Sequence, residues 1–227
     1  MNDALDHVVA LVRERDLDRY LASLYAAPAT RAGLFALHAL DLELAEVARS
    51  TTEPMLGQIR LAWWREQLQA LDAGARPAQP VLAALAEHLL PAGISGASLE
   101  PLEDAWLALL EDDVEGHAKA RGRLFGAAVE LLLPGLDSAS AQHAHRMGVG
   151  WAIVDVARNG VAVGDDMLAR ADEMLSPTTV AAPARTLAGL AALARRDLAS
   201  WQRGRMPGAR GTPGRQARLA WSILTGR

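Results

Sequence analysis

The chain has 227 residues, of which 51% are hydrophobic and only 4% aromatic, and its formal net charge is −4. A chain of this length can bury a sizeable core, and its wealth of alanine and leucine is typical of packed helices rather than sheets. The negative net charge gives no general attraction to nucleic acid, and the absence of cysteine excludes disulfides, thiolate metal sites and cysteine nucleophiles.

Two further features bear on ligands and location. Lys119 is the only lysine among the 23 lysines and arginines, which we attribute to genomic composition, so the arginines are not counted in favour of a phosphate ligand. No apolar run reaches bilayer-spanning length, and the N-terminus carries acids in place of a basic leader. We therefore expect an all-α, soluble, cytoplasmic protein.

Hydrophobic spacing, capping residues and helix breakers predict the helices in chain order. They are expected at Asp3 to about Arg13, Asp16 or Asp18 to Tyr25, Thr30 to about Arg49, Pro54 to Gly74, Val81 to Leu90, Ser98 towards Leu133, Ala139 to Arg158, Asp166 to Met174, and Ser176 to Gly204 with a break near Pro183. Thr30 and Ser98 are the expected N-caps of their helices. Together these helices predict a single helical domain over residues 1–203.

The helix expected to begin at Pro54 carries apolar residues at spacings of three and four. Leu56, Ile59, Trp63 and Leu71 recur on one side, and Trp64 and Leu68 widen the stripe. Such a stripe is typical of a face buried against the rest of a bundle. We therefore expect these side chains to lie in the core.

Residues 204–227 form a basic, Gly/Pro-rich tail in which Thr212-Pro213 can start a short last helix. Beyond Asp197 the chain has no acidic residue and several arginines. This tail could contact an anionic membrane surface peripherally, or it could be a solvated terminus. Both interpretations stay open at this point.

Two groups of polar side chains predict surface rather than metal binding. The acids between Glu100 and Glu115 are spread over several faces of a helix, as on a solvated surface. His143 and His145 are two residues apart on a helix, so they point in different directions and cannot share a metal ion.

The stretch from Thr30 to Leu71 contains LFALHAL and resembles the start of the squalene/phytoene synthase family, where a similar helix carries a D-x-x-x-D motif. Glu43-Leu44-Ala45, followed by EPMLGQIRLAWWR at residues 53–65, is similar to the complex I assembly factor 6 branch of that family. The resemblance implies a single-domain helical bundle of the isoprenoid synthase type.

Active members of that family condense two prenyl diphosphates, and the resemblance implies Mg²⁺ ions held by carboxylates of two facing helices. The first motif falls on Ala45 and Arg49, of which one has no ligand atom and the other repels a cation. Asp41 lies near Ala45 on the helix but does not rebuild the pair. The first motif therefore lacks its metal ligands.

The second motif of the family falls on Asp155, Arg158 and Asn159, which leaves one carboxylate where several are required. We therefore expect no metal ligand, no cofactor and no catalytic residue, because the charge stabilisation that ionisation needs is missing. Arg49 and Arg158 could instead bind a diphosphate or another anionic head group directly. The alternative is that Arg49 pairs with an acid such as Asp41 or Glu46.

Three functions follow from these residues and from the resemblance. The first is an inactive scaffold that assists assembly of respiratory complex I by binding its subunits, located in the cytoplasm or peripherally at the inner membrane. The second is a prenyl-lipid binder without chemistry. The third is an active squalene/phytoene-type transferase of isoprenoid or carotenoid synthesis, for which Mg²⁺ would be required, and Ala45 and Arg49 argue against it.

Overall fold

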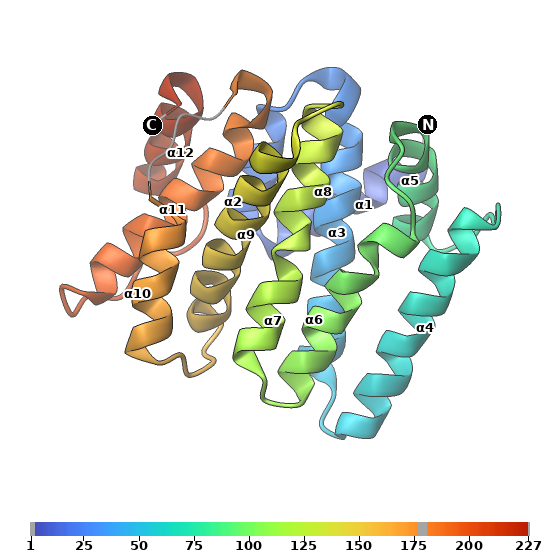
Figure 1. The fold of residues 1–227 in the computed structure, drawn as a ribbon, viewed down its shortest axis with the longest axis horizontal. Coiled ribbons are helices and arrows are strands. Elements are labelled where there is room, and N and C mark those ends of the chain that lie inside the picture. Colours follow the sequence, from blue (N-terminus) through green and yellow to red (C-terminus); the bar gives the residue numbers. More distant parts are fainter. Residues whose placement is uncertain (1–2, 177–180, 227) are drawn as a thin grey trace.

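The computed structural model describes residues 3–176 and 181–226, and within them every regular element is helical (Figure 1). The α-helices are α1 (Asp3–Arg15), α2 (Leu17–Leu24), α3 (Pro28–Ser50), α4 (Pro54–Asp72), α5 (Pro80–His88), α6 (Glu100–Leu110), α7 (Val114–Arg121), α8 (Arg123–Leu132), α9 (Ser138–Arg158), α10 (Asp165–Met174), α11 (Arg185–Trp201) and α12 (Pro213–Thr225). Short 3₁₀ turns lie at Leu90–Ala92, Ala97–Leu99 and Ala182–Ala184. The all-α prediction is confirmed.

Helix α3 is the central helix of the bundle, and α1, α5, α6 and α8 pack around it. Figure 1 shows α3 running through the middle of the molecule beside α8, with α4 at one edge and α10 and α12 at the other. Leu34, Leu37, Leu40 and Leu44, spaced by three and four, are fully buried along α3. A helix buried on almost every side can carry a polar residue only if that residue finds partners inside the bundle.

The starts of two helices differ from the prediction. Helix α3 begins at Pro28 after Ala27, because proline at the first helical position loses no hydrogen bond there, and the Thr30 hydroxyl donates back to the Ala27 carbonyl at 3.3 Å. Ser98 lies inside a 3₁₀ turn and does not cap a long helix. Aspartates cap α2 and α9 as N-cap residues, at Asp16 and Asp137.

The single long helix expected from Ser98 to Leu133 is wrong, because the chain folds there into α6, α7 and α8. Asp112 has φ 60°, and the Asp113 side chain accepts a hydrogen bond from the Gly116 N–H at 2.8 Å, which starts α7 anew. At Gly122 a side chain would approach the His145 carbonyl oxygen of α9 to 2.9 Å. The two breaks let α7 lie against α9 and place Arg121 inside the bundle.

The expected burial along α4 is wrong for three of its six residues. Leu56, Ile59 and Trp63 are 52%, 60% and 43% exposed. The buried face consists of Leu61, Trp64, Leu68 and Leu71, of which the last three were expected. Both faces of α4 carry apolar residues at helical spacing, and α4 packs mainly on α6, so one of the two apolar faces stays in solvent.

One acid of the 100–115 segment departs from the expected solvated surface. Glu103 is 2% exposed and accepts a hydrogen bond from Arg65 Nε at 2.8 Å. Burial raises the pKa of this carboxyl group, and the Arg65 guanidinium opposes that rise. Glu103 therefore joins α6 to α4 and is not part of the solvated face.

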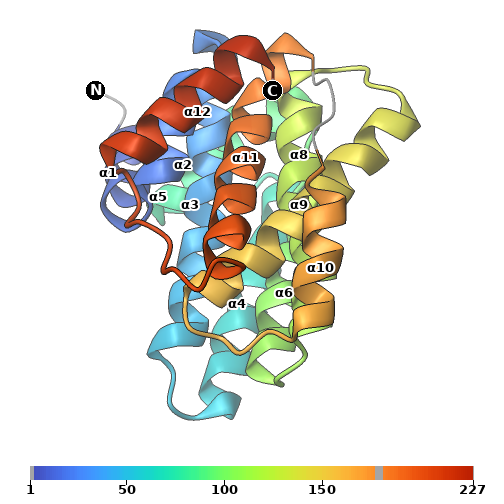
Figure 2. The same cartoon turned by 90° about the vertical axis from the view of Figure 1, so that its left-hand side faces the viewer.

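The C-terminal segment lies against the bundle. Helix α12, with Thr212 as its N-cap, packs on α11 and α2, and Figure 2 shows it crossing the upper end of α11. A side chain at Gly189 of α11 would meet Leu219 of α12 at 2.7 Å, so the two helices approach closely. The Ser176 start expected for the preceding helix borders residues 177–180, which lie outside the described part, and α11 ends at Trp201 rather than Gly204.

By length and composition, none of the helices in the described ranges could cross a bilayer alone. The segments Pro80–Ala92 and Ala97–Leu110, bent by 105°, meet that test only as a pair.

Candidate functional site

The polar centre of the bundle is built on Asp41 of α3, whose side chain is fully buried. Its Oδ1 accepts hydrogen bonds from Arg121 Nε at 2.9 Å and from Trp106 Nε1 at 3.1 Å. Its Oδ2 accepts from Arg19 Nη1 and Arg121 Nη2, each at 2.7 Å. A carboxylate has about four acceptor positions, so those of Asp41 are all used by protein donors.

Arg19 reaches this centre from α2, the second helix of the chain. Asp16 caps α2 by accepting from the backbone N–H groups of Asp18 and Arg19 at 3.1 Å, which fixes where the helix starts. The Arg19 guanidinium, 2% exposed, also lies 3.1 Å from the Asp16 carboxylate and 3.4 Å from Asp155. It therefore joins the start of α2 to α3 and α9.

Asp155 of α9 faces the same guanidinium groups from the other side. Its Oδ2 lies 2.8 Å from Arg121 Nη1, and its Oδ1 accepts from Arg210 Nη2 at 2.5 Å. Arg210, in the loop before α12, also pairs with Asp16 at 3.0 Å. These six side chains, Asp16, Arg19, Asp41, Arg121, Asp155 and Arg210, are called the central ion cluster below.

The central ion cluster is electrically balanced, with three carboxylates and three guanidinium groups. Burial alone would raise the pKa of Asp41 and Asp155. The facing arginines, among which Arg121 has the largest effect, outweigh burial and hold both pKa values well below the usual range. Burial opposes the charge of Arg121, yet Asp41 and Asp155 raise its pKa. Asp41, Asp155 and Arg121 are therefore charged at neutral pH, and three carboxylates facing three guanidinium groups leave no excess charge to attract an ion.

Aromatic rings complete the walls of the cluster. The guanidinium carbons of Arg19 and Arg121 both lie 4.7 Å from the Trp151 ring centre, and that of Arg121 lies 4.6 Å from the Trp106 ring centre. Cations over indole faces are favourable, most of all when water is excluded. The rings thus hold the arginines in place between the two aspartates.

Two buried histidines lie next to the cluster. Burial, with Arg19 nearby, lowers the pKa of His38 to about 3, and burial together with Arg121 lowers the pKa of His117 to about 4. His117 Nδ1 lies 2.8 Å from the Ala105 carbonyl oxygen. Both rings are therefore neutral at pH 7 and add no charge to the cluster.

The residues predicted as remnants of the motifs fall into two groups. Asp41 and Asp155 meet in the central ion cluster, and Ala45, 7% exposed, lines a small hollow beside it with Arg49 and Asn159. That hollow leaves about 100 Å³ of space for a water-sized sphere. The Asn159 amide donates to the Asp155 backbone carbonyl at 2.7 Å, so it closes its own helix end rather than extending a ligand set.

The two arginines proposed as anion ligands do not come together. Arg49 lies at the surface and pairs with Glu46 at 2.6 Å, one of the acids anticipated for it. Arg158 lies 2.9 Å from Asp197 and donates to the Gly208 carbonyl, on the side of α9 that faces α11. Direct anion binding by Arg49 and Arg158 stays a prediction, but each already has an acidic partner.

A second, smaller group of buried charges fixes the C-terminal segment. Arg215 of α12 is 4% exposed and pairs with Asp18 at 2.7 Å and Asp197 at 2.5 Å. Asp18 also accepts from the Gly211 N–H at 2.9 Å. Arg158, Asp197, Arg215 and Asp18 therefore balance one another, and two arginines of the expected basic tail act inside the fold.

The residues of the central ion cluster do not fit the Mg²⁺ ions that active members of this fold need. Magnesium requires free oxygen ligands, usually several carboxylates, in an octahedral arrangement. Asp41 has no acceptor position left, Asp155 faces three arginines, and the residues described contain no group of three His, Asp or Glu side chains arranged to hold a metal ion. Guanidinium groups occupy the space between the two aspartates that cations would need.

Sequence reasoning found the two aspartates but missed the arginines that join them. The sequence alone does not single out Arg19 and Arg121, because arginines are common in this chain, and Arg210 lies in the basic, Gly/Pro-rich tail. Their partners lie 22, 80 and 55 residues away along the chain. The available signal was local: Arg19 lies among the apolar residues of a short helix, where a charge needs a buried partner.

Comparison with known proteins agrees with the fold. A squalene/phytoene synthase family profile matches residues 12–205, so the chain belongs to that family. Among curated proteins it is similar to NADH dehydrogenase (ubiquinone) complex I, assembly factor 6, from several mammals. The human protein is 36% identical over 77 residues, which cover 34% of this chain and 23% of the human protein.

The bovine protein of the same name is 33% identical over 75 residues, covering 33% of this chain and 22% of the bovine one. The mouse protein is 27% identical over 146 residues, covering 61% of this chain and 43% of the mouse one. The alignments thus span less than half the length of each of these relatives.

Proposed function

We propose that this protein is a non-catalytic member of the squalene/phytoene synthase family that assists assembly of respiratory complex I by binding a protein partner. Its similarity to proteins named complex I assembly factor 6 supports the assembly role. The closed hydrogen-bonding of Asp41 supports the absence of prenyl transfer, because a carboxylate whose acceptor positions are filled by Arg19, Arg121 and Trp106 cannot also bind a metal ion.

Catalysis of prenyl condensation requires charge stabilisation of the departing diphosphate. In this chain Asp41 and Asp155 belong to the central ion cluster, whose charges pair with one another. The hollow beside the cluster has a volume of about 100 Å³. Ligand pockets of drug-sized molecules are usually larger, about 300–1,000 Å³. Both observations favour a scaffold over an enzyme.

The assembly role is tested by deleting the gene in its own host and measuring NADH:quinone oxidoreductase in the membranes. We expect that activity to fall and to return when the wild-type gene is supplied. Succinate:quinone oxidoreductase in the same membranes serves as the control for general respiratory defects. Unchanged NADH:quinone oxidoreductase in the deletion strain would contradict the assembly role.

The absence of catalysis is tested separately. Purified protein is incubated with farnesyl or geranylgeranyl diphosphate and Mg²⁺, beside an active squalene synthase as positive control. We expect no C30 or C40 product and no released pyrophosphate above the protein-free reaction. Product formation would show that the chain is a transferase after all.

A second candidate function is binding of a prenyl lipid. An apolar hollow of about 360 Å³, lined by Val129, Leu133, Met147 and Leu187 among others, lies between α8, α9 and α11, away from the central ion cluster. Lipid extraction from the purified protein followed by mass spectrometry tests this function. An isoprenoid bound in stoichiometric amount would favour lipid binding. A lipid-free protein would argue against lipid binding and leave protein binding as the proposed role.

A further inference from the structure

The outer face of α4 is an apolar surface exposed to solvent. Met55, Leu56, Ile59 and Trp63 are 71%, 52%, 60% and 43% exposed, and Ala62 is exposed between them. At 100° per residue these positions fall within about 120° of the helix circumference, so they form one stripe rather than scattered contacts. We call these five residues the α4 stripe.

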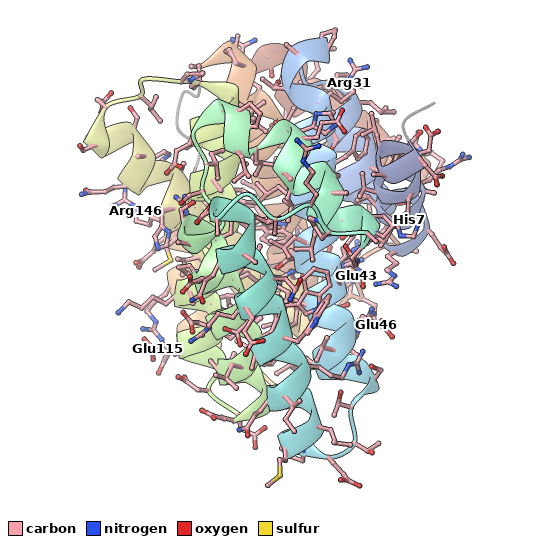
Figure 3. The ribbon with its side chains drawn as sticks, turned by 90° about the vertical axis from the view of Figure 1, so that its right-hand side faces the viewer. His7, Arg31, Glu43, Glu46, Glu115 and Arg146 are labelled. Atoms are coloured by element: carbon pink, nitrogen blue, oxygen red, sulfur yellow. The ribbon has the colours of Figure 1, made fainter. Side chains whose placement is uncertain are left out.

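The α4 stripe lies on the face of α4 that points away from the core. The opposite face of α4 supplies the core contacts, with Leu61 and Leu68 fully buried against the bundle. Gly57 lets α6 approach, since a side chain there would meet Leu110 at 2.7 Å. Figure 3 shows α4 along the side of the molecule that faces the viewer, at the edge of the bundle. Contiguous exposed apolar residues on such an edge are typical of an interaction site.

Acidic side chains border the α4 stripe. On the α6 side, Gln58 donates to Glu111 at 3.3 Å and Gln69 donates to Glu100 at 3.1 Å, so α6 carries its acids along that edge of α4. The exposed acids of this border are Glu53 and Glu66 of α4 itself and Glu111 at the end of α6. The cations beside them are Arg60 and Arg65, and Arg65 is already engaged by Glu103 and Asp104. The border therefore has an excess of negative charge.

This charge selects among the possible occupants of the α4 stripe. An anionic membrane attracts basic segments and would be repelled by the acids around the stripe. A symmetric pair of two copies would bring the acidic borders of both chains together, where like charges oppose association. A protein segment with basic residues on either side of an apolar face satisfies both the apolar and the charged parts of the surface.

We propose that the α4 stripe and its acidic border dock a basic amphipathic helix of a partner protein. The partner helix would place apolar side chains at spacings of three and four on Ile59 and Trp63, with lysine or arginine facing the acids of α6. Exposed tryptophan often contributes a large share of the binding energy at an interface, which makes Trp63 the expected anchor. This inference rests on the proposed function, in which the partner is a protein.

The test uses the full chain and two synthetic 18-residue helical peptides with the same apolar stripe. One peptide carries lysine and arginine on its polar positions, and the other carries glutamate. By calorimetry in low salt we expect the basic peptide to bind at least about tenfold more tightly than the acidic one, and the difference to shrink in high salt. Equal binding of the two peptides, or no binding, would overturn the proposal.

Two variants assign the binding to this surface. The double variant Ile59→Asp Trp63→Ser should bind the basic peptide at least about tenfold more weakly than the wild type. The control Trp221→Ser, which changes a 60% exposed tryptophan on α12, should bind it as tightly as the wild type. Glu53→Gln with Glu66→Gln and Glu111→Gln should remove most of the preference for the basic peptide. Because all these side chains are exposed, unchanged circular dichroism and thermal melting verify the fold of each variant.

Two further measurements discriminate other occupants. Binding of the wild type, but not of the Ile59→Asp Trp63→Ser variant, to phosphatidylglycerol vesicles would show a membrane surface instead. If sedimentation equilibrium shows a dimer of the wild type and a monomer of the same variant, the occupant is a second copy of the chain.

In the deletion strain, the Ile59→Asp Trp63→Ser variant should restore less NADH:quinone oxidoreductase than the Trp221→Ser control. Full restoration by both would refute the docking surface while leaving the assembly role intact.

Discussion

Asp41 of α3 and Asp155 of α9 are held by the same two guanidinium groups, those of Arg19 and Arg121. Two helices of an isoprenoid synthase-type bundle are thus bridged by cations that belong to the protein itself. Side-chain cations of this kind cannot be exchanged or removed, and they fix the spacing of the helices. The same positions therefore favour a rigid scaffold over a site that opens for a metal-bound substrate.

Asp41→Asn is the most direct test of this bridge. The substitution leaves Arg19 and Arg121 buried with one carboxylate fewer, and breaking a buried ion pair from one side typically costs about 3–5 kcal/mol. We expect the free energy of unfolding, measured by urea denaturation, to fall by roughly that amount. Glu43→Gln, which removes the partly exposed pair with Arg15, is the matched control and should cost less than about 1 kcal/mol. If Asp41→Asn also lowers the free energy of unfolding by less than about 1 kcal/mol, the bridge does not contribute to stability as inferred.

Magnesium should not stabilise this protein. A ligand at a hundred times its dissociation constant stabilises a fold by about 2.7 kcal/mol, and each kcal/mol raises the melting temperature of a chain of this size by roughly 2–4 °C. Since the central ion cluster is neutral and Asp41 has no free acceptor, we expect millimolar Mg²⁺, with or without pyrophosphate, to shift the melting temperature by less than about 1 °C. An active squalene synthase measured in parallel should show the larger shift.

A magnesium-dependent rise comparable to that of the active enzyme would mean that the arginines move aside on binding. The variant Arg121→Gln then shows whether they are the barrier. It leaves the cluster with one more negative than positive charge, so any Mg²⁺ response should be larger in this variant than in the wild type.

The sequence was sufficient for the class of fold and for most helices, but not for the pairing inside it. The spacing of Leu34, Leu37 and Leu40 predicts a buried helix because a helix turns by a fixed angle per residue. No such period links Asp41 to Arg121, since the two lie on different helices and meet only after packing. The same limit explains why Trp63 was expected in the core and is exposed. Apolar residues recur at helical spacing on both faces of α4, and only the neighbouring helices decide which face is buried.

Stability should fall steadily with acid below about pH 6.5, before the carboxylates titrate. Burial lowers the pKa of His38 to about 3 and that of His117 to about 4, so between pH 6.5 and 4 the unfolded chain binds up to two more protons at these residues than the folded one. Unfolding is therefore favoured as pH falls, by up to about 2.7 kcal/mol per pH unit from the two groups. Urea titrations at several pH values measure this slope.

His38→Gln separates the contribution of one histidine. The variant keeps a polar side chain of similar size but cannot be protonated, so the slope between pH 6.5 and 4 should fall by up to about 1.4 kcal/mol per pH unit, whatever the change in stability at pH 7. Asp41 and Asp155 act at lower pH, since carboxylates with depressed pKa values stabilise the fold above the unfolded pKa near 4 and lose that contribution as pH falls further. A flat profile between pH 6.5 and 4 would contradict buried neutral histidines.

The C-terminal segment should be required for a stable bundle, although its composition suggests a loose tail. Arg215 neutralises Asp18 and Asp197 in the interior, and Arg210 neutralises Asp16 and Asp155. Arg215→Gln leaves two buried carboxylates short of a cation, so we expect a loss of about 3–5 kcal/mol in the free energy of unfolding. The exposed Arg205→Gln is the matched control from the same segment, with an expected change within about 0.5 kcal/mol. Hydrogen exchange in α12 and at the start of α2 should be faster in Arg215→Gln than in the wild type, and unchanged in Arg205→Gln.

A chain that ends at residue 203 should unfold at a lower urea concentration than the full chain, because it lacks Arg210 and Arg215. If the two chains instead unfold at the same urea concentration, residues 204–227 are a separate tail and the buried arginines contribute nothing to the fold.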